Sequence, residues 1–199
     1  MFPPRNGRVQ VTGGFWLLIL WFWYANGWKV LVSVLAAAAS HELGHWAVLR
    51  MMGSHIDYLQ VSVFGAEMRT ANGRLSYAGE LTAALAGPAV NLAAGMILAQ
   101  MGPEAAVSAC AHLALGLFNL LPIRPLDGGK AVYTLASWLA GPVMGERLAR
   151  GLGAAAALAL AALLGWLMYC SSGSLWLLPP FFGLVCAGVK EVCGKESFL

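Results

Sequence analysis

Two histidines and a glutamate lie close together in the sequence HELGH at residues 41–45. His41 and His45 are four positions apart, so on a helix their imidazoles share one face and lie about 6 Å apart along the axis. One nitrogen of each ring can then reach the same zinc ion at about 2.0–2.1 Å. Glu42 is rotated by roughly 100° from His41, which places its carboxylate beside the metal, within reach of a water molecule. The pattern predicts a zinc centre with Glu42 as general base.

A catalytic zinc site usually takes three protein ligands and keeps one position open. The best candidate for the third ligand is Asp127, in the segment NLLPIRPLDGGK at 119–130. The prolines and glycines around it interrupt helical continuity, which allows the backbone to aim the carboxylate inward. Asp-Gly alone most often marks a turn, so the combination with HELGH is what favours a ligand. We expect one Zn²⁺ per chain, bound by His41, His45 and Asp127.

The elements that position these residues are predicted to lie in a lipid bilayer. The 199 residues are 59% hydrophobic and only 11% charged, about half the charged fraction of a typical soluble domain. Stretches of about 20 apolar residues predict membrane-spanning helices, and we find six, at 15–28, 30–51, 81–100, 105–122, 151–170 and 175–190. The boundary between the first two is poorly marked, so a single re-entrant element is the alternative there.

The membrane setting also bears on the HELGH cluster. Two histidines and a glutamate at bilayer depth are costly unless they are paired, hydrated or bound to a metal. A structural cluster of mutually satisfied polar side chains is therefore the weaker alternative to a metal site.

The basic residues indicate an orientation. If the N-terminus is cytoplasmic, every Lys and Arg except Lys29 falls in a cytoplasmic segment, as the positive-inside rule requires. We therefore expect a multi-pass protein with both termini in the cytoplasm. The net charge of +3 then reflects membrane orientation, and no basic patch interleaved with aromatic residues indicates nucleic-acid binding.

Residues 53–79 form the longest stretch without helical character. β-branched and aromatic residues partly alternate there, and Asn72-Gly73 is a tight-turn signal. We expect a β-hairpin at the membrane surface, joined by a short strand near residues 8–12, with an ordinary loop as the alternative. The expected fold is thus an all-α polytopic membrane protein of about six transmembrane helices with a small membrane-surface β-hairpin or sheet.

Small residues recur at every fourth position of the third predicted span, in the series Gly79, Ala83, Gly87, Asn91, Gly95 and Ala99. Positions four apart share a helix face, so this face lets a second helix approach closely. Asn91 in this stripe needs a hydrogen-bond partner, and a structural and a functional role are both open for it. For His112, in the fourth span, a hydrogen-bonded contact between helices is favoured over a metal ligand.

HELGH, GPAVN at 87–91 and NLLPIRPLDGGK at 119–130 occur in an order that resembles the site-2 protease family of intramembrane metalloproteases. Within it, the chain is similar to the bacterial branch that includes the stage IV sporulation protein FB, which processes a membrane-tethered sigma-factor precursor. The resemblance covers about residues 8–145. It implies that His41, His45 and Asp127 are zinc ligands, that Glu42 is the general base, and that the protein resides in a bacterial cell membrane.

Other positions receive roles from the same resemblance. Asn119 and Pro122 match the N-x-x-P element of the family, which implies that they shape the site or contact substrate. Asn119 is also a candidate contact for the oxyanion that forms during hydrolysis. The family branch often has Gly-Gly after the Phe of the hairpin loop, where this chain has Phe64-Gly65-Ala66. Phe64 and Gly65 are therefore candidate substrate contacts. We expect a single membrane-embedded protease domain over 1–199, with a core at 8–145, helices five and six within 151–190, and no soluble PDZ or CBS domain.

The expected function is hydrolysis of a peptide bond in or near a transmembrane segment of a membrane-tethered substrate, such as a sigma-factor precursor, by a zinc metalloendopeptidase. A hairpin edge near 55–70 would hold the unwound substrate by strand addition. The expected partners are that substrate, the lipid bilayer and a membrane regulatory protein, without nucleic acid, while the sequence specifies neither the substrate nor the oligomeric state. The alternatives are a prenyl-protein peptidase, which would need a distal Glu as third ligand, and a membrane zinc transporter or non-catalytic scaffold.

Overall fold

The computed structural model describes residues 8–11, 13–54, 56–62, 65–70, 75–170, 185–186 and 188–189. The chain divides into two compact units, Met1–Leu117 and Phe118–Leu199. HELGH and the small-residue stripe belong to the first unit, and Asp127 belongs to the second.

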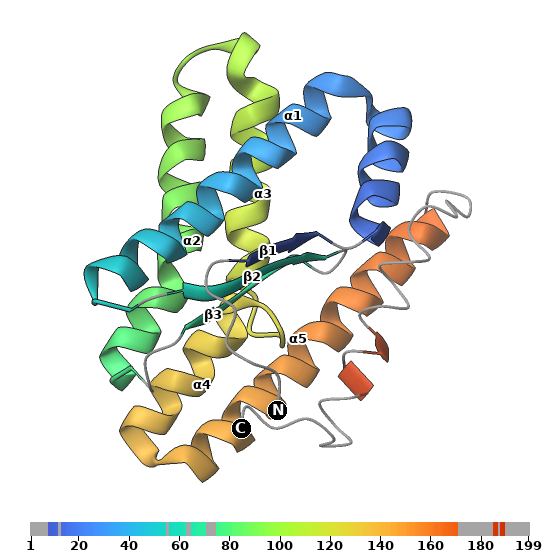
Figure 1. Cartoon of the computed structure of the whole chain (residues 1–199). Coiled ribbons are helices and arrows are strands. Elements are labelled where there is room, and N and C mark those ends of the chain that lie inside the picture. Colours follow the sequence, from blue (N-terminus) through green and yellow to red (C-terminus); the bar gives the residue numbers. More distant parts are fainter. Residues whose placement is uncertain are drawn as a thin grey trace. The chain divides into compact units, whose positions relative to one another are not determined.

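The longest element of the first unit is the helix α1 (Gly13–Met51), which runs for 39 residues with a kink inside it. The kink lies at Gly27, whose φ of 80° and ψ of 168° are not helical and suit a residue without a Cβ. Figure 1 shows α1 as two limbs that run in different directions. The two limbs correspond to the predicted spans 15–28 and 30–51, and HELGH lies in the second limb.

The helix α2 (Tyr77–Ala99) packs against α1 through the small-residue stripe. Ser76 caps its N-terminus, because the Ser76 hydroxyl accepts a hydrogen bond from the backbone N–H of Gly79 at 3.2 Å. Four members of the stripe are buried, namely Gly79, Gly87, Asn91 and Gly95, so the packing role predicted for this face is confirmed. The approach to α1 is close, since a Cβ added at Gly44 would lie 2.9 Å from the backbone oxygen of Ala86.

A three-stranded sheet lies where the hairpin and its flanking strand were expected (Figure 1). Its strands are β1 (Arg8–Val11), β2 (Ile56–Ser62) and β3 (Gly65–Thr70), in the order β1-β2-β3. β1 runs parallel to β2, and β2 runs antiparallel to β3. The central strand is therefore β2.

The Asn72-Gly73 turn signal does not join these two strands. Ser62 pairs with Gly65, so the chain passes from β2 to β3 at residues 63–64, and Asn72-Gly73 follows β3. Residues 63–64 and 71–74 lie outside the described residues. Asn72-Gly73 thus lies nine residues beyond the connection between β2 and β3, and its tight turn stays a prediction.

The helix α3 (Ala106–Asn119) follows a short 3₁₀ turn, η1 (Pro103–Ala105). It has 14 residues, which span about 21 Å, less than the roughly 30 Å of a bilayer's hydrocarbon core. The predicted span 105–122 is therefore a helix, but a short one. A hydrogen bond of 2.9 Å between the hydroxyls of Ser33 and Ser108 links α1 to α3.

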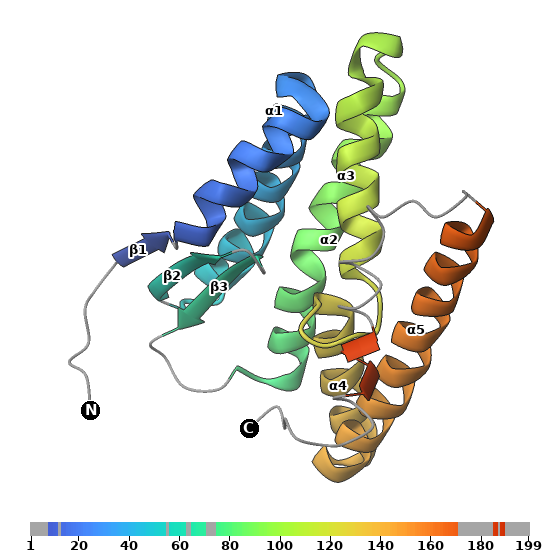
Figure 2. The same cartoon turned by 90° about the vertical axis from the view of Figure 1, so that its right-hand side faces the viewer.

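The second unit contains the helices α4 (Asp127–Ala140) and α5 (Pro142–Cys170), which lie side by side (Figure 2). Buried small residues follow one face of α5 at every fourth position, namely Gly145, Ala149, Gly153, Ala157 and Ala161. A Cβ at Gly145 would overlap the hydroxyl of Ser137 on α4. The two helices pack through this small-residue face.

The helix α4 was not expected, because Gly128-Gly129 was interpreted as a break in helical structure. Both glycines lie in the first turn of α4 and are buried. A Cβ at Gly128 would overlap the backbone of Leu120, and one at Gly129 would lie 2.8 Å from the backbone oxygen of Ile123. The glycines therefore let the preceding loop pack onto the helix, and the helical break is confined to residues 120–126.

Within the part of the chain that the structure describes, three helices are long and apolar enough to cross a membrane: α1, α2 and α5. The first two predicted spans are the limbs of α1, and the fourth is the shorter α3. The sixth span, 175–190, falls almost wholly outside the described residues.

Candidate metal centre

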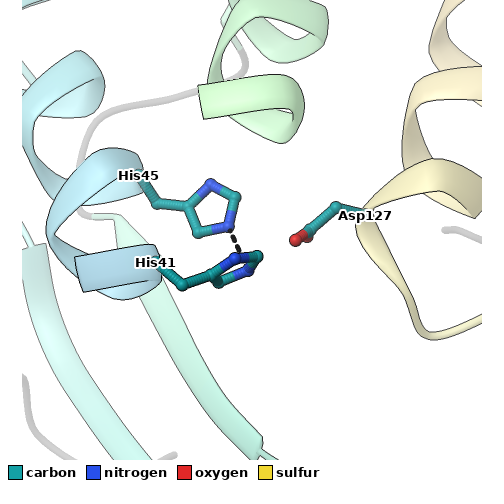
Figure 3. Close-up of side chains that lie close together, drawn as sticks. All are labelled: His41, His45 and Asp127. Carbon is teal, nitrogen blue, oxygen red and sulfur yellow. Dashed lines mark hydrogen bonds between the residues drawn. The ribbon is translucent and has the colours of Figure 1, made fainter. Parts of the chain in front are cut away.

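His41 and His45 face each other across one turn of α1, as their spacing predicted. Their Nε2 atoms lie 3.1 Å apart, and their ring planes meet at 81° with centroids 4.7 Å apart. Figure 3 shows the two rings with these nitrogens turned toward one another. His41 is only 5% exposed. Both imidazoles thus offer the same kind of nitrogen to one point in space.

The ring of His45 is oriented by the backbone of α2. Its Nδ1–H donates a hydrogen bond to the carbonyl oxygen of Ala83 at 2.7 Å. Because Nδ1 then carries the proton of the neutral ring, the lone pair lies on Nε2, the atom that faces His41. Metal-binding histidines in proteins are commonly held by such a bond from the nitrogen that does not bind the metal.

Gly87, the first residue of GPAVN, makes room for this ring. A Cβ added at Gly87 would overlap His45 Nε2 and lie 2.8 Å from both ring carbons that flank it. The glycine stripe of α2 therefore does more than admit a neighbouring helix: at this position it admits a candidate ligand. No pattern in the sequence indicates this role, because a stripe of small residues predicts close packing without identifying the group that fills the space.

Asn91 extends the polar group on the other side of His41. Its amide nitrogen lies 3.3 Å from His41 Nδ1, and its amide oxygen lies 3.2 Å from His112 Nδ1. Asn91 is fully buried, and His112 is 5% exposed. The prediction that His112 makes a hydrogen-bonded contact between helices is confirmed, and its partner is Asn91.

Glu42 and Gly44 complete HELGH. Glu42 is the residue after His41 on α1 and is partly buried, and its role as general base stays a prediction. Gly44 lies at the point of closest approach between α1 and the backbone of α2. The helix pair therefore brings HELGH and GPAVN together within the first unit.

Asp127, in the second unit, is the first residue of α4 and is 6% exposed. A carboxylate is favourable at this place, because the N-terminus of a helix carries a partial positive charge. Its Oδ1 atom accepts a hydrogen bond from Lys130 Nζ at 3.1 Å. The loop before it is tied to α5, since Arg124 Nη2 donates to Glu146 Oε1 at 2.9 Å.

His41 and His45 of the first unit each offer an imidazole nitrogen as a metal ligand, and Asp127 of the second unit offers a carboxylate oxygen. Two imidazole nitrogens and one carboxylate oxygen are a ligand set that catalytic zinc accepts, with a position left open for water or substrate. The donor set of these residues thus fits zinc.

The remaining candidate residues are placed as follows. Asn119 is the last residue of α3, Pro122 lies in the loop 120–126, and Gly65 begins β3. Phe64 lies outside the described residues. Contacts of these four with a substrate or an oxyanion stay predictions.

Sequence comparison finds related proteins of known class, although no family model matches the chain. The "Putative zinc metalloprotease Rip3" of Mycobacterium tuberculosis is 31% identical over 134 residues, which are 61% of this chain and 33% of that protein. The "Zinc metalloprotease MJ0392" of Methanocaldococcus jannaschii is 29% identical over 143 residues, 66% of this chain and 41% of the relative. The chain thus spans between a third and two fifths of the length of these curated relatives.

Structural comparison decides the fold. The "Site-2 Protease from Methanocaldococcus jannaschii" superposes with a TM-score of 0.63 and 23% identity, over 94% of each chain. The chain has the site-2 protease fold. The resemblance to the site-2 protease family is thus confirmed at the level of the fold, and the related zinc metalloproteases support it. The three long apolar helices of the described residues fit a membrane protein. The narrower resemblance to the sporulation branch stays a prediction.

Proposed function

We propose that the chain is a zinc metalloprotease that hydrolyses a peptide bond in or near a transmembrane segment of a membrane-tethered protein. The observation that carries the proposal is the pair of facing Nε2 atoms of His41 and His45 on an apolar helix. The site-2 protease fold and the curated names of the relatives support the same activity. His41, His45 and Asp127 are the proposed ligands of one zinc ion.

Different residues of the chain have different proposed roles in peptide hydrolysis. A bound zinc ion supplies Lewis-acid activation of a water molecule and of the peptide carbonyl. Glu42 accepts the proton of the attacking water and passes it to the leaving amine. The backbone of α2 keeps the His45 ring in place through Ala83. Asn119 is the proposed contact for the oxyanion, and Pro122 shapes the loop that leads to Asp127.

The substrate is proposed to bind as an extended strand. A helical substrate hides its carbonyls in hydrogen bonds, so it must unwind before cleavage. β2 already has a neighbour on each side, whereas β1 and β3 each have a strand partner on one side only among the described strands, and of these two edges only β3 lies within the segment 55–70. The proposed docking edge is therefore β3, a narrower choice than the whole segment 55–70, next to the candidate contacts Phe64 and Gly65.

The cellular setting is proposed from the charge pattern and the resemblance. The protein is a multi-pass component of a bacterial cell membrane with both termini in the cytoplasm, because this orientation keeps every basic residue except Lys29 on the cytoplasmic side. Its partners are the bilayer, the tethered substrate and a membrane regulatory protein. A sigma-factor precursor is the substrate that the resemblance to the sporulation branch favours.

The direct test compares the purified protein with its Glu42→Gln variant. Both are reconstituted with a single-span substrate, and cleavage and bound zinc are measured. The variant should retain zinc and lose about 10²- to 10⁴-fold in cleavage rate, because a positioned general base contributes that much. Equal cleavage by the two proteins would remove Glu42 as the base, and transport of zinc without cleavage would favour a transporter.

Asp127 is tested separately through metal affinity. Asp127→Asn replaces the charged oxygen ligand by a neutral amide and should weaken zinc binding by at least about tenfold. Glu104→Gln is the matched control, because Glu104 is an exposed acidic residue of the short turn η1 and is not a candidate ligand. Zinc binding that is lost equally in both variants, or in neither, would contradict Asp127 as the third ligand.

A further inference from the structure

The loop at residues 120–126 carries one charged side chain, Arg124, and this side chain has a partner on α5. Arg124 Nη2 donates to Glu146 Oε1 at 2.9 Å, and the two side chains are 14% and 24% exposed. Glu146 is the only acidic residue between Asp127 and Glu191 in the sequence. A largely buried ion pair contributes little net stability, because desolvation of the charges offsets much of their attraction. Its main effect here is geometric, since it fixes the loop against α5.

A tight turn connects Arg124 to Asp127. The backbone N–H of Leu126 donates to the carbonyl oxygen of Ile123 at 2.8 Å. Arg124 and Pro125 are the two central residues of this turn, and the φ angle of a proline is nearly fixed. Ile123 is only 3% exposed, so the start of the turn is held in the interior. A displacement of Arg124 would therefore be passed on to the backbone of Asp127.

The first turn of α4 has no side-chain cap. Leu126 occupies the N-cap position, and its side chain makes no hydrogen bond to the helix. Ser, Thr, Asp or Asn usually fills this position and binds one of the backbone N–H groups that the helix leaves free. α4 thus lacks the common support of a helix start at the place where it carries Asp127. The turn that Arg124 ties to α5 offers a different support for the same backbone.

Glu146 lies at a firmly packed point of α5. A Cβ added at the preceding residue, Gly145, would overlap the hydroxyl of Ser137 on α4 and lie 2.9 Å from the Ser137 backbone nitrogen. Ala149, one turn further along α5, is 2% exposed. This end of α5 therefore cannot shift along α4 without losing close contacts. The ion pair thus ties the loop to a rigid position.

We propose that Arg124 and Glu146 are positioning residues for Asp127. Their ion pair, in place of a side-chain cap, fixes the first turn of α4 and with it the carboxylate that Asp127 offers to the metal. Neither residue is itself a candidate ligand. The inference rests on the proposed function in one respect, namely that Asp127 binds zinc. An ion pair that only stabilises the fold predicts no specific effect on zinc affinity.

The first test measures hydrogen exchange of the full chain in detergent after zinc is removed with a chelator. Glu146→Leu removes the acceptor for Arg124 and should make the N–H groups of Leu126 and Lys130 exchange roughly tenfold faster, because both are bonded within the turn and the helix start. Peptides from α2 are the internal reference and should keep their rates. Wild-type exchange at residues 120–130 in this variant would overturn the proposal.

The second test measures zinc affinity by competition with a chelator. Glu146→Leu and Arg124→Met should each weaken binding by about tenfold, as for other losses of support around a ligand. The double variant should bind no more weakly than the weaker single variant, because all three remove the same interaction. Arg124→Lys keeps the positive charge and should recover most of the affinity. Additive losses in the double variant, or equal losses in Arg124→Lys and Arg124→Met, would overturn the proposal.

Ala161→Val is the matched control for a general loss of packing. Ala161 is buried on the same face of α5 as Gly145, about 24 Å further along the helix. The larger side chain should lower the thermal stability through overpacking, while zinc affinity and exchange in the loop stay at their wild-type values. A loss of zinc affinity equal to that of Glu146→Leu would overturn the positioning role, because disturbed packing of α5 would then explain both.

The two measurements separate this inference from the proposed function. If Asp127→Asn weakens zinc binding while Glu146→Leu leaves it unchanged, the inference is overturned and Asp127 stands as a ligand. If Asp127→Asn leaves zinc binding unchanged, Asp127 is not a ligand, and the positioning role fails together with that part of the proposed function. Faster exchange in the loop, weaker zinc binding in both single variants and recovery in Arg124→Lys are the results expected.

Discussion

Among single residues, the candidate ligand His45 depends on two positions of α2 that have no metal chemistry of their own. Ala83 contributes only its carbonyl oxygen, and Gly87 contributes only the absence of a side chain. Holding the ring in place before zinc binds reduces the conformational freedom that binding must remove. A backbone carbonyl and a glycine thus act as part of the site although neither touches the ion.

Gly87→Ala should weaken zinc affinity by more than any loss of protein stability accounts for. The added methyl group would overlap His45 Nε2, so either the imidazole turns away or α2 retreats from α1. We expect at least about tenfold weaker zinc binding, as for other losses of support around a ligand. The measurement is zinc affinity in detergent, together with thermal unfolding of the zinc-free protein.

Gly95→Ala is the matched control for that variant. It is a buried stripe glycine of the same helix, but its added Cβ would press on the side chain of Leu113, with 2.6 Å to Cγ. Overpacking of this kind costs about 1–3 kcal/mol of stability, and zinc affinity should stay near the wild-type value. Equal zinc affinities of the Gly87 and Gly95 variants would show that Gly87 is a packing residue only.

Residue patterns predicted the local part of the site and left open the part that depends on tertiary contacts. The spacing of His41 and His45 is a property of one helix turn, so their facing geometry followed from sequence alone. The role of Asn91 did not, because its partners are separated from it by 50 and 21 positions. Only the packing of three helices reveals that it joins two histidines.

At the level of elements, the packing of the loop before α4 explains why the sequence did not predict α4 and why the Asp127 carboxylate is buried. Gly128 and Gly129 lower helix propensity, so the sequence indicated a break there. In the structure their lack of side chains lets residues 120–126 pack onto the first turn of the helix. Packing thus overrides propensity, and it leaves Asp127 at the helix N-terminus with Lys130 as a partner.

In the sheet, local sequence patterns predict where the strands lie but not their register. Partly alternating residues within 53–79 predicted a hairpin, with a short strand expected near 8–12, and strands lie in both segments. Asn-Gly is a strong local turn signal, but which strands a turn joins depends on which residues pair. Pairing of Ser62 with Gly65 decides the register, and no local pattern reports it.

If the substrate adds to β3 as a strand, proline substitutions at two neighbouring positions of β3 should reduce kcat/KM to different extents. Backbone N–H groups alternate between the two edges of a strand, so either Ala66→Pro or Glu67→Pro removes an N–H that faces away from β2. Loss of one such hydrogen bond to the substrate is worth about 0.5–1.5 kcal/mol, or roughly two- to tenfold in kcat/KM. The assay is cleavage of a single-span substrate at matched zinc content.

Val9→Pro supplies the control for these prolines, because it alters the strand at the opposite side of β2. Its kcat/KM should stay within the range of the unmodified protein. Should both β3 variants cleave as fast as wild type with zinc bound, the docking edge lies elsewhere.

For the whole molecule, the distribution of basic residues predicts the orientation in the membrane, which the helices alone do not. Among the described residues, three helices can cross a membrane by length and composition, but neither property gives a direction. The basic residues do, because crossing the bilayer outward is unfavourable for Lys and Arg. Under that rule the segment after α1 is cytoplasmic, and the turn between α2 and α3 is on the opposite side.

Two exposed methionines at helix ends allow this orientation to be tested with matched probes. Met52 follows α1 and is 39% exposed, and Met101 follows α2 and is 68% exposed. With the native cysteines replaced by serine, Met101→Cys should react with a membrane-impermeant thiol reagent in intact cells. Met52→Cys should react only after the cells are permeabilised. The reverse pattern would place HELGH near the outer surface and would exclude a cytoplasmic segment as the product released by cleavage at this site.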